Sequence, residues 1–358
     1  MKKALKLFLA LLVSVSLAAC SSNSNNEATS TEGTETTSTS GECPVTIGLV
    51  TDMGGVDDKS FNQSAWEGVQ RFAKENGLEN CVSYLQSTTE ADYVPNLSTF
   101  ADEGKDLVMA VGYLFNEAIT EVSANYPDTK FLFVDDVVEH DNVESATFNA
   151  EQGSFLVGVA AGLTASENGS KKVGFMGGME GPIIGSFQAG YEQGVLAACP
   201  DCKIYVDYAD SFADDAKGQQ LAAKQYDLGA TVIYQAAGNA GNGVIKEAKE
   251  RGDVWAIGVD KDQYEDGMKD DGTSIILTSM LKRVDSATYS ACTDLLNGTF
   301  EAGVKVFNLS NDGVGAEVTS GRNLSDDVIA QINDYAEKIK NGEIEVTPEA
   351  TIANGSSN

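Results

Sequence analysis

The chain has 358 residues, with 54 acidic and 24 basic side chains and a formal net charge of −30 at pH 7. This charge argues against nucleic acid as a partner, because phosphate contacts need clustered Lys and Arg. An anionic membrane would also repel the folded part. The roughly 300 residues that follow a polar N-terminal segment exceed one small core and suit two lobes of ordinary domain size.

The start of the chain has the features of a lipoprotein signal peptide. Residues 1–19 combine a basic start, an apolar run too short to span a bilayer, and small residues before Cys20. The sequence LAAC resembles a bacterial lipobox, in which the cysteine is lipidated after cleavage; an ordinary signal peptide that happens to contain a cysteine is the alternative. We expect a lipid on Cys20 to anchor the chain at the extracytoplasmic face of the cell membrane.

The segment after this cysteine cannot bury a core. Residues 21–42 contain no apolar residue larger than Ala, so we expect 20–42 to be a disordered tether. A folded body should begin near Cys43.

The remaining cysteines can form disulfides, because export permits them. Cys43 and Cys81 stand at the starts of two expected neighbouring strands, and we predict that they pair. The sequence CPDC, with Cys199 and Cys202, fits a zinc half-site, a redox pair or a loop staple. We favour the staple, since the sequence has no second CxxC and no His-rich partner.

In the folded part, short apolar runs alternate with helical patterns. The runs predicted as strands are VTIGLV (45–50), VSYLQ (82–86), LVMAVG (107–112), KFLFVD (130–135), KKVGFMG (171–177), KIYVDY (203–208), TVIYQAA (231–237) and VWAIGVD (254–260). Helices are predicted at SAWEGVQRFAKENG (64–77), FNEAITEVSANYP (115–127), SFLVGVAAGLTASENG (154–169) and GNGVIKEAKERG (241–252), among others. Near-continuous Val, Ile and Leu in the strands indicates burial on both faces, hence an α/β fold with doubly wound parallel sheets.

One helix pattern occurs twice. SFNQSAWEGV at 60–69 recurs as SFQAGYEQGV at 186–195, each after the first strand of its half of the chain. Two similar lobes that face each other would place both copies at the rims of one cleft, where such sheets bind ligands. A chance match is the alternative.

The turn after the first strand is acidic. TDMGGVDDKSFNQSAWEG carries two adjacent glycines, which let the backbone approach a ligand, and three acids, Asp52, Asp57 and Asp58. These carboxylates would repel a phosphate. A neutral ligand rich in hydroxyl or N–H donors fits better, because carboxylates only accept hydrogen bonds.

The same turn offers groups that suit a heterocycle. Phe61 supplies a flat apolar face, and Asn62 carries both a donor and an acceptor. The alternative is purely structural: Phe61 belongs to the core and the aspartates cap the helix. For this turn alone, both interpretations stand.

Five motifs in order closely resemble the basic membrane protein family, the nucleoside-binding lipoproteins related to purine nucleoside receptor A. They are GGVDDKSFNQSAWEG, FVDD (133–136), YQAAGNAGNGV (234–244), AIGVDKDQ (256–263) and LTSMLKRVD (277–285), and the resemblance runs from Cys43 to about Lys340. It implies the type I periplasmic-binding-protein fold, with two lobes joined by a hinge. It also implies that the protein is a monomer that captures nucleosides, with purine nucleosides as the favoured ligands, and delivers them to the permease of an ABC importer.

The resemblance also implies roles for individual residues. Asp52, Asn62 and Asp135 would contact the ligand, with Asp135 reading the base. Phe61 would stack on one face of the base and Phe212 on the other, with Phe187 as the candidate that the repeated pattern favours. The remaining expected ligand contacts are Gly238 through its backbone, and Asp260 and Lys282 on the ribose hydroxyls.

This fold predicts how the chain is divided. We expect an N-terminal lobe at 43–150 with a returning segment near 283–304, a C-terminal lobe at 151–282 and about 305–345, and a flexible tail at 346–358.

An enzyme is the rival class. The single histidine, His140, fits a solvated loop better than a general base, and the sequence has no G-x-S-x-G, no H-E-x-x-H and no Walker loop. DKDQYED (260–266) lacks the spacing and glycine of a calcium loop. We therefore expect no catalysis, no metal and no cofactor. A sugar or autoinducer receptor of the same fold, and a carboxylate-only nucleoside hydrolase, stay as alternatives.

Overall fold

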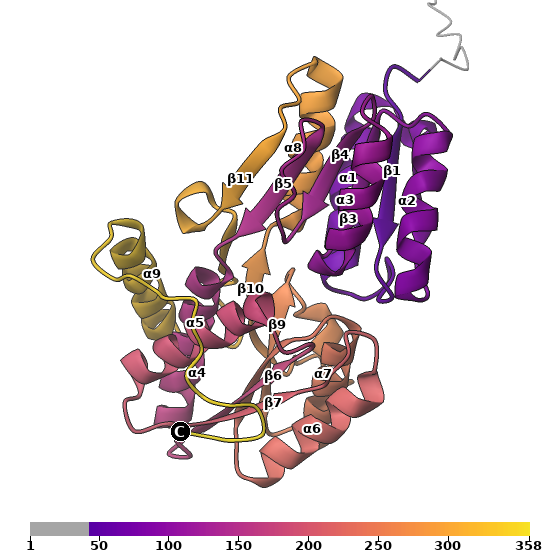
Figure 1. Cartoon of the computed structure of the whole chain (residues 1–358). Helices are drawn as coiled ribbons and strands as arrows, with labels where there is room; N and C mark the ends of the chain where they lie inside the picture. Colours follow the sequence, from indigo (N-terminus) through magenta and orange to yellow (C-terminus); the bar gives the residue numbers. More distant parts are fainter. Residues whose placement is uncertain (1–42) are drawn as a thin grey trace, which may run out of the picture. The chain divides into compact units, whose positions relative to one another are not determined.

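A computed structural model describes residues 43–358 of the chain (Figure 1). The expected signal peptide at 1–19, the lipidation site Cys20 and the tether at 20–42 lie outside the described residues. Within the described residues, no helix is both long enough and apolar enough to cross a membrane.

The first lobe contains a six-stranded parallel sheet in the order β11-β5-β4-β3-β1-β2. Its strands are β1 (Ile47–Thr51), β2 (Val82–Gln86), β3 (Leu107–Val111), β4 (Lys130–Val134), β5 (Val143–Phe148) and β11 (Gly303–Phe307). Its helices are α1 (Phe61–Asn76), α2 (Tyr93–Asp102), α3 (Asn116–Asn125) and α8 (Val284–Asn297). The helices α1 and α8 pack on one face of the sheet, and α2 and α3 pack on the other.

The second lobe contains a six-stranded sheet in the order β12-β10-β9-β8-β6-β7, in which only β12 is antiparallel to its neighbour. Its strands are β6 (Lys172–Gly177), β7 (Lys203–Tyr208), β8 (Val232–Ala236), β9 (Trp255–Asp260), β10 (Ile276–Lys282) and β12 (Val314–Ala316). Its helices are α4 (Ala150–Glu167), α5 (Pro182–Ala198), α6 (Asp215–Asp227), α7 (Asn239–Arg251) and α9 (Asp326–Lys340). The helices α4, α5 and α9 cover one face, and α6 and α7 cover the other.

The apolar strands are buried on both faces, as their sequences predicted. Every residue of β1, β3 and β8 is buried, which fits strands covered by helices on both sides. The predicted helix ends also hold, because α1 stops at Gly77 and α7 at Gly252, both in the left-handed conformation.

The sequence analysis did not predict four of the strands. In β5 and β10, buried polar residues such as Glu144, Thr278 and Ser279 interrupt the apolar run. The strand β11 lies at the sheet edge and has no buried residue, and β12 has only three residues. Apolar periodicity therefore misses strands whose polar side chains find partners inside the protein.

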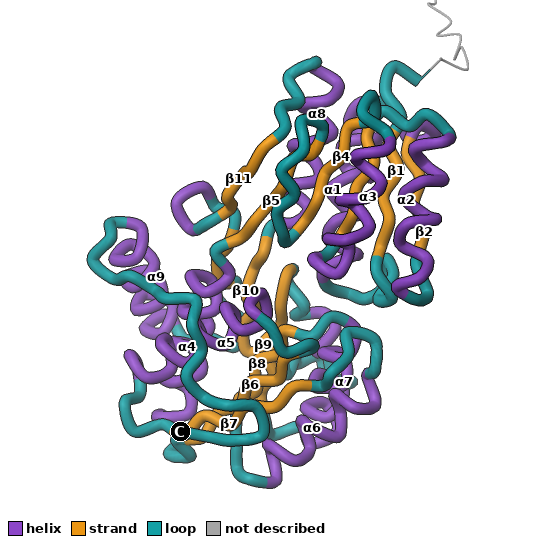
Figure 2. Tube along the Cα trace, viewed as in Figure 1, coloured by secondary structure: helices purple, strands orange, loops and turns teal. Residues whose placement is uncertain are grey.

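The chain passes between the two sheets three times. The first passage follows β5 near Asn149, the second follows β10 at Arg283, and the third follows β11 near Asn308 (Figure 2). Because β11 ends at Phe307, the segment that returns to the first sheet extends a few residues beyond the expected end near 304. Three adjacent passages of this kind give the lobes a common hinge region.

The expected flexible tail at 346–358 instead lies along the second lobe, and Figure 2 shows it as a loop that ends beside β7. The backbone of Val206 in β7 donates to the carbonyl of Ser356 at 3.0 Å and accepts from the N–H of Gly355 at 2.9 Å. Glu192 on α5 accepts from Thr351. The tail covers the free edge of β7, and this explains why a polar segment is ordered there.

Two disulfides are present. Cys43 and Cys81 pair, as predicted, and join the chain before β1 to the start of β2. Cys199 and Cys202 also pair and staple the connection between α5 and β7. Cys292 is a buried thiol in α8, and its burial raises its pKa well above the usual range.

Candidate functional site

A pocket lies between the two lobes, at the carboxyl ends of strands from both sheets. The empty space between its side chains, open solvent included, is about 580 Å³. All eight predicted ligand residues line it, together with the reserve candidate Phe187. The full lining is Asp52, Gly54, Asp58, Phe61, Asn62, Gly112, Tyr113, Leu114, Asp135, Ile183, Ile184, Phe187, Phe212, Ala236, Ala237, Gly238, Asn239, Val259, Asp260 and Lys282.

Two aspartates of the acidic turn after β1 have different roles. Asp58 accepts from the backbone N–H groups of Ser60, Asn62 and Gln63 at 2.9 to 3.0 Å, so it caps the start of α1. Asp52 accepts only one backbone N–H, that of Gly54 at 2.8 Å, and lines the pocket. The capping alternative therefore holds for Asp58, and Asp52 is free to receive a ligand donor.

Asn62 presents an acceptor to the pocket. Its Nδ2 donates to Asp52 at 2.8 Å and to Asp58 at 3.0 Å, and these two carboxylates fix the orientation of the amide. Its Oδ1 is buried without a hydrogen-bond partner among the described residues. A buried carbonyl of this kind costs free energy unless a ligand or water donates to it. Asn62 is thus prepared to accept an N–H.

Two carboxylates at strand ends sit in an unusual backbone conformation. Asp135 follows β4 with φ 82°, and Asp260 ends β9 with φ 66°. Non-glycine residues seldom adopt this left-handed region, and such strain clusters at functional sites. Both side chains are buried and line the pocket.

Lys282, at the end of β10, bridges the lobes at this point. Its Nζ lies 2.5 Å and 2.6 Å from the two carboxylate oxygens of Asp135. The same Nζ lies 4.5 Å from the ring centroid of Phe61 and 5.7 Å from that of Phe187. A third ring, that of Phe148, has its centroid 4.9 Å from this Nζ, so one carboxylate and three aromatic rings surround the ammonium group.

Three phenylalanines border the pocket. Phe61, the first residue of α1, and Phe212, in the loop after β7, are both half-buried, whereas only 3% of Phe187 on α5 is exposed. Phe212 meets Tyr113 of the first lobe edge-on, with ring centroids 6.2 Å apart. Gly238 lies against Phe212. Its φ of 55° favours a residue without a side chain.

Burial controls the charge of the pocket. It raises the pKa of Asp52 to about 6, against the lowering effect of the Gly54 and Asn62 hydrogen bonds. It raises the pKa of Asp260 to about 6 as well, although Lys282 and the Ser60 hydroxyl favour the charged form. The pKa of Asp58 is also raised by burial. The pocket thus concentrates hydrogen-bond acceptors around a single ammonium group.

Sequence reasoning missed several lining residues. Tyr113 comes directly after the predicted strand at 107–112, and Asn239 lies inside a quoted motif. Ile183 and Ile184 belong to the first turn of α5, the helix that carries the repeated pattern. The repeat could have indicated this turn, because α1 and α5 occupy equivalent places in the two lobes.

The rival catalytic features lie elsewhere. His140 sits in the loop between β4 and β5, where its Nδ1 lies 2.8 Å from the Ser123 hydroxyl, and it does not line the pocket. Among the described residues, no group of His, Cys, Asp and Glu side chains is placed to hold a metal ion.

Comparisons with known proteins agree on one family. Residues 45–349 match the family model of PnrA-like ABC transporter substrate-binding proteins. The CD4+ T-cell-stimulating antigen of Listeria monocytogenes is 46% identical over 316 residues, which cover 84% of this chain and 87% of that protein. The ABC transporter nucleoside-binding protein BmpA of Lactococcus lactis is 37% identical over 298 residues, with 79% and 84% covered.

Solved structures share the fold. A solute-binding protein of an ABC transporter system from Aeropyrum pernix K1 superposes with a TM-score of 0.74 at 27% identity, over 84% of this chain and 93% of that one. The two sheets, their helices and their order are those of type I periplasmic binding proteins, which confirms the fold expected from the sequence.

Proposed function

Because the chain belongs to the PnrA-like family of ABC transporter substrate-binding proteins, we propose that it captures a nucleoside in the pocket between its lobes. It then presents the nucleoside to the permease of an ABC importer. Purine nucleosides are the first candidates. A relative that is 37% identical is named as a nucleoside-binding protein, and this name supports the ligand class.

The observation that carries the proposal is the pairing of aromatic faces with carboxylates. Four aspartates and one lysine supply the charges of the lining, beside three phenylalanines. Carboxylates repel phosphate and bind N–H and O–H donors strongly. A nucleoside has an aromatic base to stack and ribose hydroxyls to donate, and it lacks the phosphate of a nucleotide.

Both lobes would contact the base, and the second lobe would hold the ribose. Phe61 stacks on one base face, at roughly 1 to 3 kcal/mol, and Phe212 or Phe187 covers the other. Asp135 and Asn62 read the edge of the base, and Asp52 accepts a donor beside them. The polar groups assigned to the ribose are Asp260, which accepts its hydroxyls, Lys282, which donates to them, and the backbone at Gly238.

Calorimetry on residues 43–358 tests this function. Purine and pyrimidine nucleosides, their free bases, pentoses, hexoses and nucleoside monophosphates are titrated in turn. We expect nucleosides to bind with affinity in the micromolar range or tighter, which needs about 8 kcal/mol, and monophosphates to bind far more weakly. Tight binding of a free sugar with no response to nucleosides would favour the sugar or autoinducer receptor instead.

The chain should bind without chemistry. After incubation with a nucleoside, chromatography should recover the intact ligand and no free base. Release of base and ribose at a rate that Asp260→Asn removes would instead support the nucleoside hydrolase.

The proposed function also includes attachment to the membrane. A lipid on Cys20 would hold the protein on the extracytoplasmic face of the membrane, next to its permease. The acidic body would be repelled by an anionic bilayer, so the lipid supplies the attachment. We propose that the protein acts there as a monomer.

A further inference from the structure

Gln263 lies in the loop after β9 and has no exposed surface. Its Oε1 accepts from the backbone N–H of Val259 and from Gln235 Nε2, both at 2.9 Å. Its own N–H donates to the Ser279 hydroxyl at 3.1 Å. These bonds join β8, β9 and β10 and hold the loop that begins after the strained residue Asp260.

The other end of this amide crosses to the first lobe. Gln263 Nε2 donates to the backbone carbonyl of Lys59 at 3.0 Å. Lys59 lies in the acidic turn with φ 61°, and the next residue, Ser60, donates its hydroxyl to Asp260. One buried amide therefore contacts the turn that leads into Phe61 and also braces the loop that carries Asp260.

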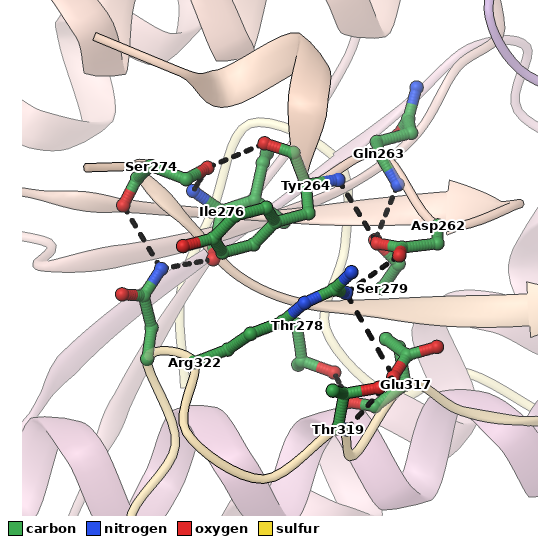
Figure 3. A network of polar contacts seen from close by, with 11 residues as sticks. Asp262, Gln263, Tyr264, Ser274, Ile276, Thr278, Ser279, Glu317, Thr319 and Arg322 are labelled. Carbon is green, nitrogen blue, oxygen red and sulfur yellow. Dashed lines mark hydrogen bonds and ion pairs between the residues drawn. The ribbon is translucent and has the colours of Figure 1, made fainter. Parts of the chain in front are cut away.

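The amide cannot reverse its orientation. Its Oε1 already receives two donors, so only Nε2 can face Lys59. The loop is also fixed from outside, as Figure 3 shows, by Arg322. This guanidinium lies 2.6 Å from Asp262 and 4.4 Å from the ring centroid of Tyr264. The contacts that place this donor thus all come from the second lobe.

We propose that Gln263 is a positioning residue, which couples closure of the lobes to the placement of Asp260; this inference rests on the proposed nucleoside site. When the lobes are closed, the Lys59 carbonyl satisfies the buried donor. When they separate, both groups lose this bond and must be solvated. Closure then requires the acidic turn to hold the backbone conformation that aims Ser60 at Asp260, and a ligand that stabilises this turn stabilises closure.

Two variants of Gln263 and one control test the proposal in the full chain. Gln263→Glu keeps an acceptor for Val259 and Gln235 and replaces the donor with a group that repels the Lys59 carbonyl. Gln263→Met removes both ends of the amide. Gln225→Met is the matched control, because Gln225 is equally buried in the second lobe and donates to Phe175 and Asp207 of the same lobe.

For each protein we measure the affinity by calorimetry, the dissociation rate by stopped flow and the radius of gyration by small-angle scattering. The ligands are adenosine, guanosine, inosine and uridine. Both Gln263 variants should bind about five- to hundred-fold more weakly, dissociate faster, and keep a larger radius of gyration at saturation than the wild type. Gln225→Met should lower the melting temperature and leave affinity and closure unchanged. If the Gln263 variants bind and close like the wild type, or if Gln225→Met weakens binding equally, the proposal is overturned.

Failure of the proposed function would look different. If the wild type binds none of these nucleosides, the nucleoside assignment fails for all variants alike. Scattering of the ligand-free proteins then decides the role of Gln263. A larger radius of gyration for Gln263→Glu than for the wild type and Gln225→Met supports interlobe coupling, and equal radii overturn it.

Discussion

Lys282 in the second sheet holds Asp135 from the first, with its Nζ within 2.6 Å of both carboxylate oxygens. Both side chains are almost fully buried, at 3% and 9% exposure. A buried pair of this kind stabilises a structure only as long as both partners remain, because either charge alone is costly to bury. This pair therefore links the closed arrangement of the lobes to the charge state of the pocket.

Removal of Lys282 tests that link. Lys282→Met should lower the free energy of unfolding by about 3 to 5 kcal/mol, because Asp135 is left as an uncompensated buried carboxylate. Urea unfolding of the variant measures this loss. The double variant Lys282→Met/Asp135→Asn should recover much of the stability, and a double variant as unstable as the single one would contradict the pairing.

Phe61→Ala distinguishes a stacking face from a core residue. Loss of one base face should weaken nucleoside binding by about 1 to 3 kcal/mol, roughly five- to hundred-fold, with little change in the melting temperature of the empty protein. Phe187→Ala is the matched comparison, because that side chain is buried and should cost about 3 to 5 kcal/mol of stability. Intact affinity in a destabilised Phe61→Ala would assign Phe61 to the core.

Asp260→Asn separates the ribose from the base. If this carboxylate accepts the ribose hydroxyls, the variant should lose about 1 to 3 kcal/mol of nucleoside affinity and almost none for the free base. Paired titrations with a nucleoside and its base give the comparison. Equal losses for both ligands would place Asp260 beside the base or in a purely structural role.

The buried carboxyls predict opposite pH dependences for stability and binding. The pKa values of Asp52 and Asp260 are about 6 in the folded protein, above the unfolded value near 3.9. Between about pH 4 and 6 the folded state binds protons that the unfolded chain has released, so these groups make the free energy of unfolding fall as the pH rises. A ligand donor needs the charged form, so nucleoside affinity should rise over the same window.

Calorimetry and urea unfolding at pH 5, 6 and 7.5 check both slopes. The double variant Asp52→Asn/Asp260→Asn should flatten them together. A wild-type affinity that stays constant from pH 5 to 7.5 would show that neither carboxylate accepts a ligand donor.

The lipid anchor can be checked by metabolic labelling. A fatty-acid analogue should label the wild type and leave Cys20→Ala unlabelled, and the variant should appear in the soluble fraction. Equal labelling of both proteins would reject Cys20 as the site of attachment.

The sequence predicted site residues well where a polar side chain stands at the carboxyl end of an apolar strand. Asp52 and Asp135 each follow an apolar strand of the first sheet, and Asp260 ends an apolar strand of the second, so the carboxyl edges of the two sheets bring all three to the pocket. The pairing of Asp135 with Lys282 could not be read in this way. Those residues are 147 positions apart in different sheets, and only the closed lobes bring them together.

The second aromatic face shows the same limit. The repeated pattern indicated Phe187 and the family resemblance indicated Phe212, and both side chains line the pocket. Helix geometry places Phe187 in α5, whereas Phe212 belongs to a loop whose path depends on Gly178 and Gly238. The sequence carries no periodic signal for a loop position of this kind.

The segment 355–358 is attached to β7, the edge strand of the second sheet. Asn358 accepts from the backbone N–H of Ile204 through its side chain and donates to the carbonyl of Cys202. An affinity tag or fluorescent protein fused directly after Asn358 would begin at this strand edge and compete with the native contacts. Shortening the segment would leave β7 open to pair with a strand of another molecule. Labels for transport or imaging studies are therefore better placed on an exposed loop of the first lobe than at this terminus.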